Sequence, residues 1–197
     1  MTTMRWPGAS TERIPVAVLG ATGIVGQHLV RMLQGHPWFR LAEVAASQRS
    51  RGRRYRDAVS WSAPGEMPDE ACEIRLKAAE DPMESRVVLS ALPAAVAEEV
   101  EPALARRGHL VSSNASALRP RPDVPLVVPE VNAASLALLA GQPWAESGGA
   151  VVTNQNCVVA GLAPVMKLLD DEWSIDSGVV VTLKSLSGAG LDGPSAL

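Results

Sequence analysis

The feature that most constrains the fold is a short apolar run that passes through a glycine-rich turn into a helical pattern. IPVAVLG (14–20) is rich in β-branched residues and ends at a glycine. GIVGQHLVRMLQG (23–35) then changes period, with Val25, Leu29 and Leu33 on one helical face. A strand that enters a helix through glycines is the opening unit of doubly wound α/β folds.

The rest of the chain repeats this alternation. We expect a helix at 94–107 and further strands at 41–47, 86–93, 109–116 and 124–132. The less periodic segment 48–84 is expected to hold one strand and surface loops. Near-continuous apolar strands between helices predict a mostly parallel sheet with helices on both faces, the Rossmann-type α/β class.

The first turn, Gly20-Ala21-Thr22-Gly23-Ile24-Val25-Gly26, has the spacing GxxGxxG. Glycines here permit a tight turn, close packing of helix on strand, and approach of backbone N–H groups to a pyrophosphate. The turn therefore predicts a dinucleotide site. The alternative is a glycine-rich turn without a ligand.

The end of the second strand indicates which dinucleotide is bound. NAD sites usually place an acidic residue there, but here Ser47 is followed by Arg49 and Ser50, and Glu43 comes too early in the strand. A hydroxyl and a guanidinium suit the 2′-phosphate of NADP. Alternatively the arginines of RSRGRRYR (49–56) form a solvated basic loop.

A cysteine stands where another strand passes into a helix, in VVTNQNCVVAGLAPVMKLL (151–169). The positive end of the helix dipole and free N–H groups would favour the thiolate of Cys157 and an oxyanion formed by its attack on a carbonyl. The alternative is a small buried hydrophobic residue. Cys72 lacks this setting and is expected to be structural. Pro164 is expected to kink the helix.

Composition excludes several classes of protein. The net charge of −3 gives no general attraction to nucleic acid or anionic membranes. We find no signal peptide, no membrane-spanning run, no zinc-ligand spacing and no disulfide framework in the sequence. A cytoplasmic enzyme or binding domain without a metal is expected.

Several motifs, in order along the chain, resemble the archaeal and fungal-like branch of the aspartate-semialdehyde dehydrogenases. They are GATGIVGQHLVRMLQGHPWF, AASQRSRGRRYRDAVSW, SALP, SSNASALR, DVPLVVPEVN, NQNC and SLSGAG. The resemblance implies NADPH-dependent reduction of L-4-aspartyl phosphate to aspartate 4-semialdehyde, a step toward lysine, threonine and methionine. It also implies an NADP-binding domain at 1–150, the start of an α+β catalytic and dimerisation domain at 151–197, a small-molecule substrate and a homo-oligomer.

The resemblance assigns roles to individual residues. Cys157 would be the acyl-forming nucleophile, and Asn114 and Arg119 would belong to the substrate-phosphate region. The cofactor-binding residues it implies are Gly20, Thr22, Gly23, Ile24, Val25, Ser47, Arg49, Ser50, Ser90, Ala91, Leu92, Ser187, Gly188, Ala189 and Gly190.

The sequence departs from the family in length. Members are roughly twice as long, and the acid/base histidine and substrate-carboxylate arginine of the family have no counterpart here. Loss of a general base typically costs about 10²–10⁴-fold in rate, so turnover by this chain is in doubt. A strand at 178–190 is expected to have few partners and open edges. A related malonyl-CoA or other acyl-CoA reductase, or a non-catalytic NADP-binding fragment, are the alternatives.

Overall fold

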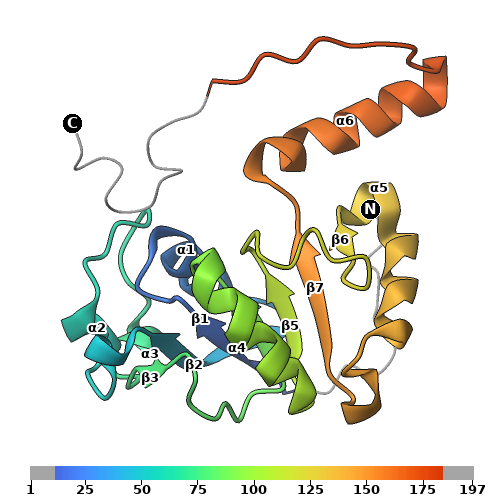
Figure 1. Ribbon diagram of the computed structural model, residues 1–197. Helices are drawn as coiled ribbons and strands as arrows, with labels where there is room; N and C mark the ends of the chain where they lie inside the picture. Colours follow the sequence, from blue (N-terminus) through green and yellow to red (C-terminus); the bar gives the residue numbers. More distant parts are fainter. Residues whose placement is uncertain (1–11, 184–197) are drawn as a thin grey trace. The chain divides into compact units, whose positions relative to one another are not determined.

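The computed structural model describes residues 12–183, which belong to two compact units, Met1–Val88 and Leu89–Leu197. Figure 1 shows the course of the chain through both. Each unit is built from short strands joined by helical segments. We describe them in turn.

The first unit opens with the strand–turn–helix that the sequence predicts. Its elements are β1 (Ile14–Leu19), α1 (Ile24–Leu33), β2 (Phe39–Ala46), η1 (Gln48–Ser50), α2 (Tyr55–Ala58), α3 (Asp69–Cys72) and β3 (Lys77–Ala78). The strands lie in the order β3-β2-β1 and pair in parallel, with Leu19 opposite Ala45. The apolar residues of β1 are fully buried from Val16 to Leu19, which explains the continuous apolar run in the sequence.

The second unit repeats the pattern. After β4 (Val87–Ser90), which spans the boundary between the units, come α4 (Ala94–Arg106), β5 (Leu110–Ser113), β6 (Leu126–Val127), α5 (Pro129–Asn132), η2 (Ala133–Gly141), η3 (Ala145–Ser147), β7 (Ala150–Asn154) and α6 (Cys157–Trp173). β7 pairs in parallel with β5 on one side and β6 on the other. The parallel strands and helical connections of both units confirm the predicted Rossmann-type α/β class.

Two predicted strands are wrong in part. Of the strand expected at 124–132, only Leu126–Val127 forms, because Pro129 occupies the first turn of α5 and sets a helical φ there. Residues 178–183 form no strand, and Val179 and Leu183 are 95% and 99% exposed. No neighbouring strand pairs with them among the described residues, and an unpaired strand gains no hydrogen bonds.

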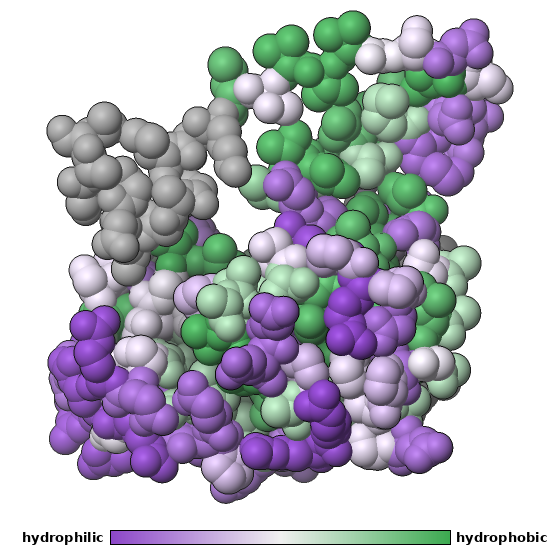
Figure 2. Space-filling model, viewed as in Figure 1, coloured by the Kyte–Doolittle hydropathy of each residue, from purple (hydrophilic) through white to green (hydrophobic). Residues whose placement is uncertain are grey.

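Helix α6 has a partly apolar surface. It runs through Pro164, and no residue in it is buried. Figure 2 shows hydrophobic residues gathered on its visible face. The exposed large hydrophobic residues of α6 include Val165, Leu168 and Trp173. Within residues 12–183, no helix is both long enough and apolar enough to cross a membrane.

Candidate functional site

The glycine turn in the first unit has the geometry expected of a phosphate-binding turn. Gly20 adopts a φ of +70°, which a residue with a side chain rarely adopts, and Gly23 N–H donates to the Gly20 carbonyl at 3.0 Å. Ala21 N–H donates to Ala45 O at 3.0 Å, so the turn lies directly over the end of β2. The predicted cofactor residues Gly20, Thr22, Gly23, Ile24 and Val25 all lie in this turn or at the start of α1.

Gly26 allows α1 to approach the turn closely. A Cβ atom at this position would lie 2.1 Å from the Gly20 carbonyl oxygen and 2.7 Å from Ala21 Cα. Both are backbone atoms that no change of rotamer can move. The third glycine of the motif is therefore required by packing, as predicted for a dinucleotide turn.

Two side chains that sequence reasoning missed hold this turn in place. Gln27 is fully buried; its Nε2 donates to Thr22 O at 2.9 Å, and its Oε1 accepts from Ser62 N at 2.6 Å. The Tyr55 hydroxyl, also fully buried, donates to Ala21 O at 2.7 Å. Gln27 shares the buried side of α1 with Val30 and Leu33, and the helical face predicted from the sequence did not include it. Nothing in the sequence links Tyr55 to the turn.

The arginines of residues 49–56 differ in what they bind. Four of the five have partners within the unit: Arg51 with Asp81 at 2.8 Å, Arg53 with the Asp57 carbonyl, Arg54 with Glu73 at 3.3 Å, and Arg56 with Glu73 at 2.7 Å. Arg49 is exposed and has no partner among the described residues. It lies in η1 between Ser47 and Ser50, at the end of β2. Arg49 is therefore the arginine of this loop without a partner among the described residues.

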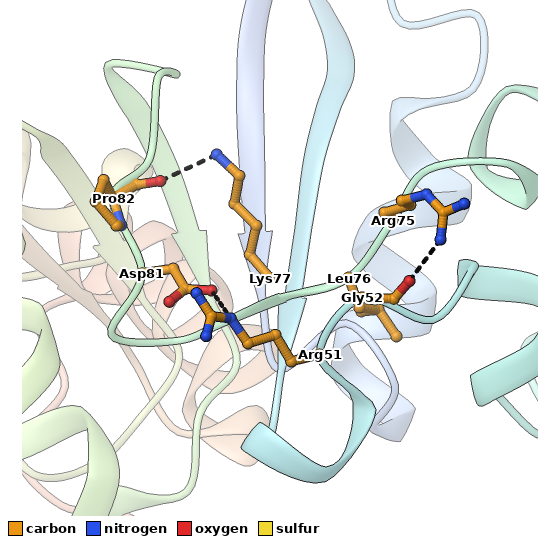
Figure 3. Close-up of a pocket in the computed structure, with 7 residues that line it drawn as sticks. All are labelled: Arg51, Gly52, Arg75, Leu76, Lys77, Asp81 and Pro82. Carbon is orange, nitrogen blue, oxygen red and sulfur yellow. Dashed lines mark hydrogen bonds and ion pairs between the residues drawn. The ribbon is translucent and has the colours of Figure 1, made fainter.

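A shallow groove of about 450 Å³ lies beside this loop (Figure 3). Its lining residues are Arg51, Gly52, Arg75, Leu76, Lys77, Asp81 and Pro82. The close-up shows the cations turned toward acceptors: Arg51 to Asp81, Arg75 to the Gly52 carbonyl, and Lys77 to the Pro82 carbonyl. None of the predicted site residues lines the groove, and its hydrogen bonds have a structural role.

The cysteine of the second unit lies at the first residue of α6, as predicted. The preceding Asn156 caps the helix, because its side chain accepts a hydrogen bond from Val158 N at 2.8 Å. Cys157 is exposed, and its Sγ lies 3.8 Å from Asn156 Oδ1. Exposure argues against the alternative of a small buried hydrophobic residue. The thiol is accessible to a reagent.

Asn114 and Arg119 lie together beside the connection that leads to the cysteine. Arg119 Nη2 donates to Asn114 O at 2.9 Å and to Gln155 O at 3.4 Å. Asn154 Nδ2 donates to Asn114 Oδ1 at 3.1 Å. Arg119 Nε is buried, and within the described residues it has no hydrogen-bond partner. Asn154 and Gln155 were missed as site residues, because only the fold brings β7 beside the loop after β5.

Ser90 is the last residue of β4, and Ala91 and Leu92 follow it. The Ser90 carbonyl accepts from Asn114 N at 2.9 Å and from Asn114 Nδ2 at 3.3 Å. The ends of β4 and β5 are therefore joined through Asn114. The last predicted cofactor residues, Ser187, Gly188, Ala189 and Gly190, lie outside the described residues.

The other candidate ligands have ordinary surroundings. Cys72 is half-buried in α3, and its thiol lies 3.6 Å from the Pro68 carbonyl. Across residues 12–183 no cluster of three or more His, Cys, Asp or Glu side chains could hold a metal ion.

Comparison with known proteins identifies the family. Residues 15–139 match the family model described as "Semialdehyde dehydrogenase, NAD binding domain". This chain belongs to the semialdehyde dehydrogenase family. The predicted resemblance is thereby confirmed, and it extends beyond the matched domain to named relatives.

Those relatives include archaeal and fungal aspartate-semialdehyde dehydrogenases. This semialdehyde dehydrogenase family member is 44% identical to the protein from Archaeoglobus fulgidus over 94% of the chain, and 42% identical to that from Methanothermobacter thermautotrophicus over 91%. Its structure matches the Candida albicans enzyme, solved with NADP, at a TM-score of 0.75 and 34% identity over 83% of the chain. The chain spans about half the length of these proteins: 54%, 52% and 48%, respectively.

Proposed function

We propose that this chain provides the NADP-binding site and the nucleophile for the reduction of L-4-aspartyl phosphate to aspartate 4-semialdehyde and phosphate. One observation carries the proposal. Arg119 donates to the carbonyl of Gln155, two residues before the exposed thiol of Cys157. The guanidinium of Arg119, which would hold the phosphoryl group, thus lies close in the fold to the thiol of Cys157, which would displace phosphate from the substrate. We place the cofactor domain at 1–150 and the start of the catalytic domain at 151–197.

The glycine turn and its neighbours fit NADP. The turn after β1 presents backbone N–H groups, and Gly26 keeps α1 against it without a side chain between them. Arg49 is the described arginine of its loop that remains free for a 2′-phosphate, with Ser47 and Ser50 on either side. When bound, NADPH would supply the hydride for the reduction. The NADP in the Candida relative's structure supports this choice of cofactor.

Cys157 would act as the nucleophile. Its thiolate forms a bond to the acyl carbon of the substrate while the bond between that carbon and the phosphate oxygen breaks, and phosphate leaves. The N–H groups in the first turn of α6 would stabilise both the thiolate and the oxyanion. With the hydride that NADPH would supply, the thioester would be reduced, the carbon–sulfur bond would break, and Cys157 would be regenerated as the thiolate.

Asn114 and Arg119 would hold the phosphoryl group. The guanidinium already uses Nη2 for two backbone carbonyls, so its orientation is set before substrate binds. Its Nε is buried and has no hydrogen-bond partner within residues 12–183. A buried donor without a partner costs about 1–3 kcal/mol, and a bound phosphate would relieve part of that cost. A small phosphorylated substrate, homo-oligomerisation and a cytoplasmic location complete the proposal.

The test is covalent chemistry at Cys157. The chain is incubated with L-4-aspartyl phosphate, and the adduct is measured by intact-mass spectrometry and mapped by proteolysis. We expect a thioester on Cys157, no adduct with Cys157→Ser, and an unchanged adduct with the matched control Cys72→Ser. A folded chain that forms no adduct, or forms it on Cys72, would contradict the proposal. An adduct formed only from malonyl-CoA would favour the acyl-CoA reductase alternative.

A further inference from the structure

Asn114, Arg119 and Asn154 are called the phosphate cluster below. A carboxyl group that the proposed chemistry does not use lies buried near this cluster. Glu101, in the middle of α4, is 0% exposed. Helix α4 packs against β5, β7 and η3. Neither β5 nor β7 contains a titratable residue, and Glu146 of η3 is exposed. Burial of a carboxylate without a cation is costly, because desolvation disfavours the charged form.

Two serines surround this carboxyl group. Ser113 Oγ donates to Glu101 Oε1 at 2.7 Å and accepts from Ala115 N at 3.1 Å. Ser90 is fully buried. Its Oγ and Glu101 Oε2 are both buried atoms without a hydrogen-bond partner in the described part of the chain. Either the Ser90 hydroxyl or a proton on Oε2 can supply the donor for this contact, and burial of the carboxyl group without a cation favours the proton on Oε2.

The electrostatics agree with this geometry. Burial raises the pKa of Glu101, and the hydroxyl groups of Ser90 and Ser113 only partly oppose the effect. Ser90 is one of the groups that act on the carboxyl group, although its Oγ forms no hydrogen bond of standard geometry in the described part of the chain.

We propose that Glu101 is a neutral positioning residue, whose carboxylic acid accepts from Ser113 with one oxygen and donates to Ser90 with the other, and so sets the geometry of the phosphate cluster. The inference rests on the proposed function, since it assigns Glu101 to the phosphate site. It adds a residue that touches neither substrate nor cofactor.

The route from Glu101 to the cluster is short. Ser113 directly precedes Asn114, and the Ser90 carbonyl accepts from Asn114 N at 2.9 Å. Asn114 O in turn accepts from Arg119 Nη2 at 2.9 Å. A carboxylic acid between the two serines therefore fixes both strand ends that orient Asn114, and through it the guanidinium. A carboxylate could accept from the Ser90 hydroxyl as well, but it would carry a buried charge without a cation.

The experiment compares variants by two independent measurements. Glu101→Gln keeps one acceptor and one donor, Glu101→Leu removes both, and Ser90→Ala removes only the acceptor for the proposed proton. Glu99→Gln, at an exposed position on the same helix, is the matched control. Infrared difference spectra at neutral pH report a protonated carboxyl group. Titration with inorganic phosphate reports the geometry of the cluster.

We expect a protonated-carboxyl band in the wild type and in Glu99→Gln that is absent from Glu101→Gln. We also expect phosphate affinity within about threefold of wild type for both glutamine variants, and a loss of about tenfold or more for Glu101→Leu and Ser90→Ala, about 1.4 kcal/mol. Should Glu101→Leu fail to fold, Ser90→Ala still decides the second measurement.

Two results would overturn the inference: a wild type without the band, or a folded Ser90→Ala chain that binds phosphate as the wild type does. Failure of the proposed function looks different. In that case the wild type and all variants bind no phosphate. The band in the wild type would then show a neutral Glu101 without a positioning role, which also rejects the inference.

Discussion

Replacing Gly26 with alanine would test the packing of α1 on the glycine turn. The added Cβ would meet the Gly20 carbonyl oxygen at 2.1 Å and two further backbone atoms at 2.7 Å. Overpacking by a single methyl group typically costs about 1–3 kcal/mol. We expect the upper end of this range, about 3 kcal/mol, because backbone atoms cannot move aside as a side chain can. With an m-value of about 2 kcal/mol/M, the urea midpoint falls by about 1.5 M.

Cofactor affinity should fall with stability. The turn must move by about 1 Å to admit the methyl group, which displaces the N–H groups that would bind the pyrophosphate. Misplacement of active-site groups on that scale can lower a catalytic rate about 10²-fold. The assay is urea unfolding followed by NADPH titration of the folded variant. Gly161→Ala is the control, since nothing lies within 4 Å of its added Cβ and alanine in a helix gains about 0.5–1 kcal/mol. A Gly26→Ala chain that unfolds at the wild-type midpoint would refute this reasoning.

Three further predictions concern charge and hydrogen bonding. Arg49→Ala removes a charge-assisted bond of about 1.5–3 kcal/mol, so it should weaken NADPH binding about 10–100-fold in fluorescence titrations and leave NADH binding unchanged. Arg56→Ala is the control, because Arg56 is paired with Glu73. Equal losses of affinity for both dinucleotides would count against a role of Arg49 in binding the 2′-phosphate. Burial raises the pKa of Tyr55, the single tyrosine, above its ordinary value of 10, so its absorbance should change only when alkali unfolds the chain; ionisation in the folded state near 10 would be the contrary result. At Glu43, burial opposes ionisation, but hydrogen bonds from Lys77 and backbone N–H groups outweigh it and lower the pKa below 4.5. The stabilisation of the fold by ionised Glu43 is therefore present above about pH 4.5 and is lost as the pH falls through the folded-state pKa. Glu43→Gln should flatten the acid side of a curve of unfolding free energy against pH. An unchanged curve would reject this role of Glu43.

Local patterns predicted the elements that carry the chemistry. The strand, turn and helix from Ile14 to Leu33 follow from β-branched residues, glycine spacing and a change of period, all contained in one short segment. The same holds for Cys157, whose place at the start of α6 follows from a polar turn before an apolar run. Such features depend on neighbours in sequence, so sequence alone is sufficient to predict them.

Contacts between distant segments could not be predicted in this way. Asp81 and Glu73, which bind the arginines of the basic loop, lie in a segment without clear periodicity. The hydrogen bond of Tyr55 to the glycine turn joins residues 34 positions apart. The helix α5 is different, because Pro129 followed by Glu130 is a helix-start signal that the apolar run before it obscured.

The pairing of arginines in the basic loop determines how far its positive charge reaches. The carboxylates of Asp57, Glu73 and Asp81 lie within 3.8 Å of its guanidinium groups, so they offset most of the positive charge of the loop within the unit itself. Positive charge remains at Arg49 and at Arg53, whose partner is a neutral carbonyl, and salt at physiological strength screens such charges beyond about 8 Å. The loop would therefore interact with a dinucleotide only at short range. It would contribute to recognition of the bound ligand and not to long-range electrostatic steering of ligands from solution.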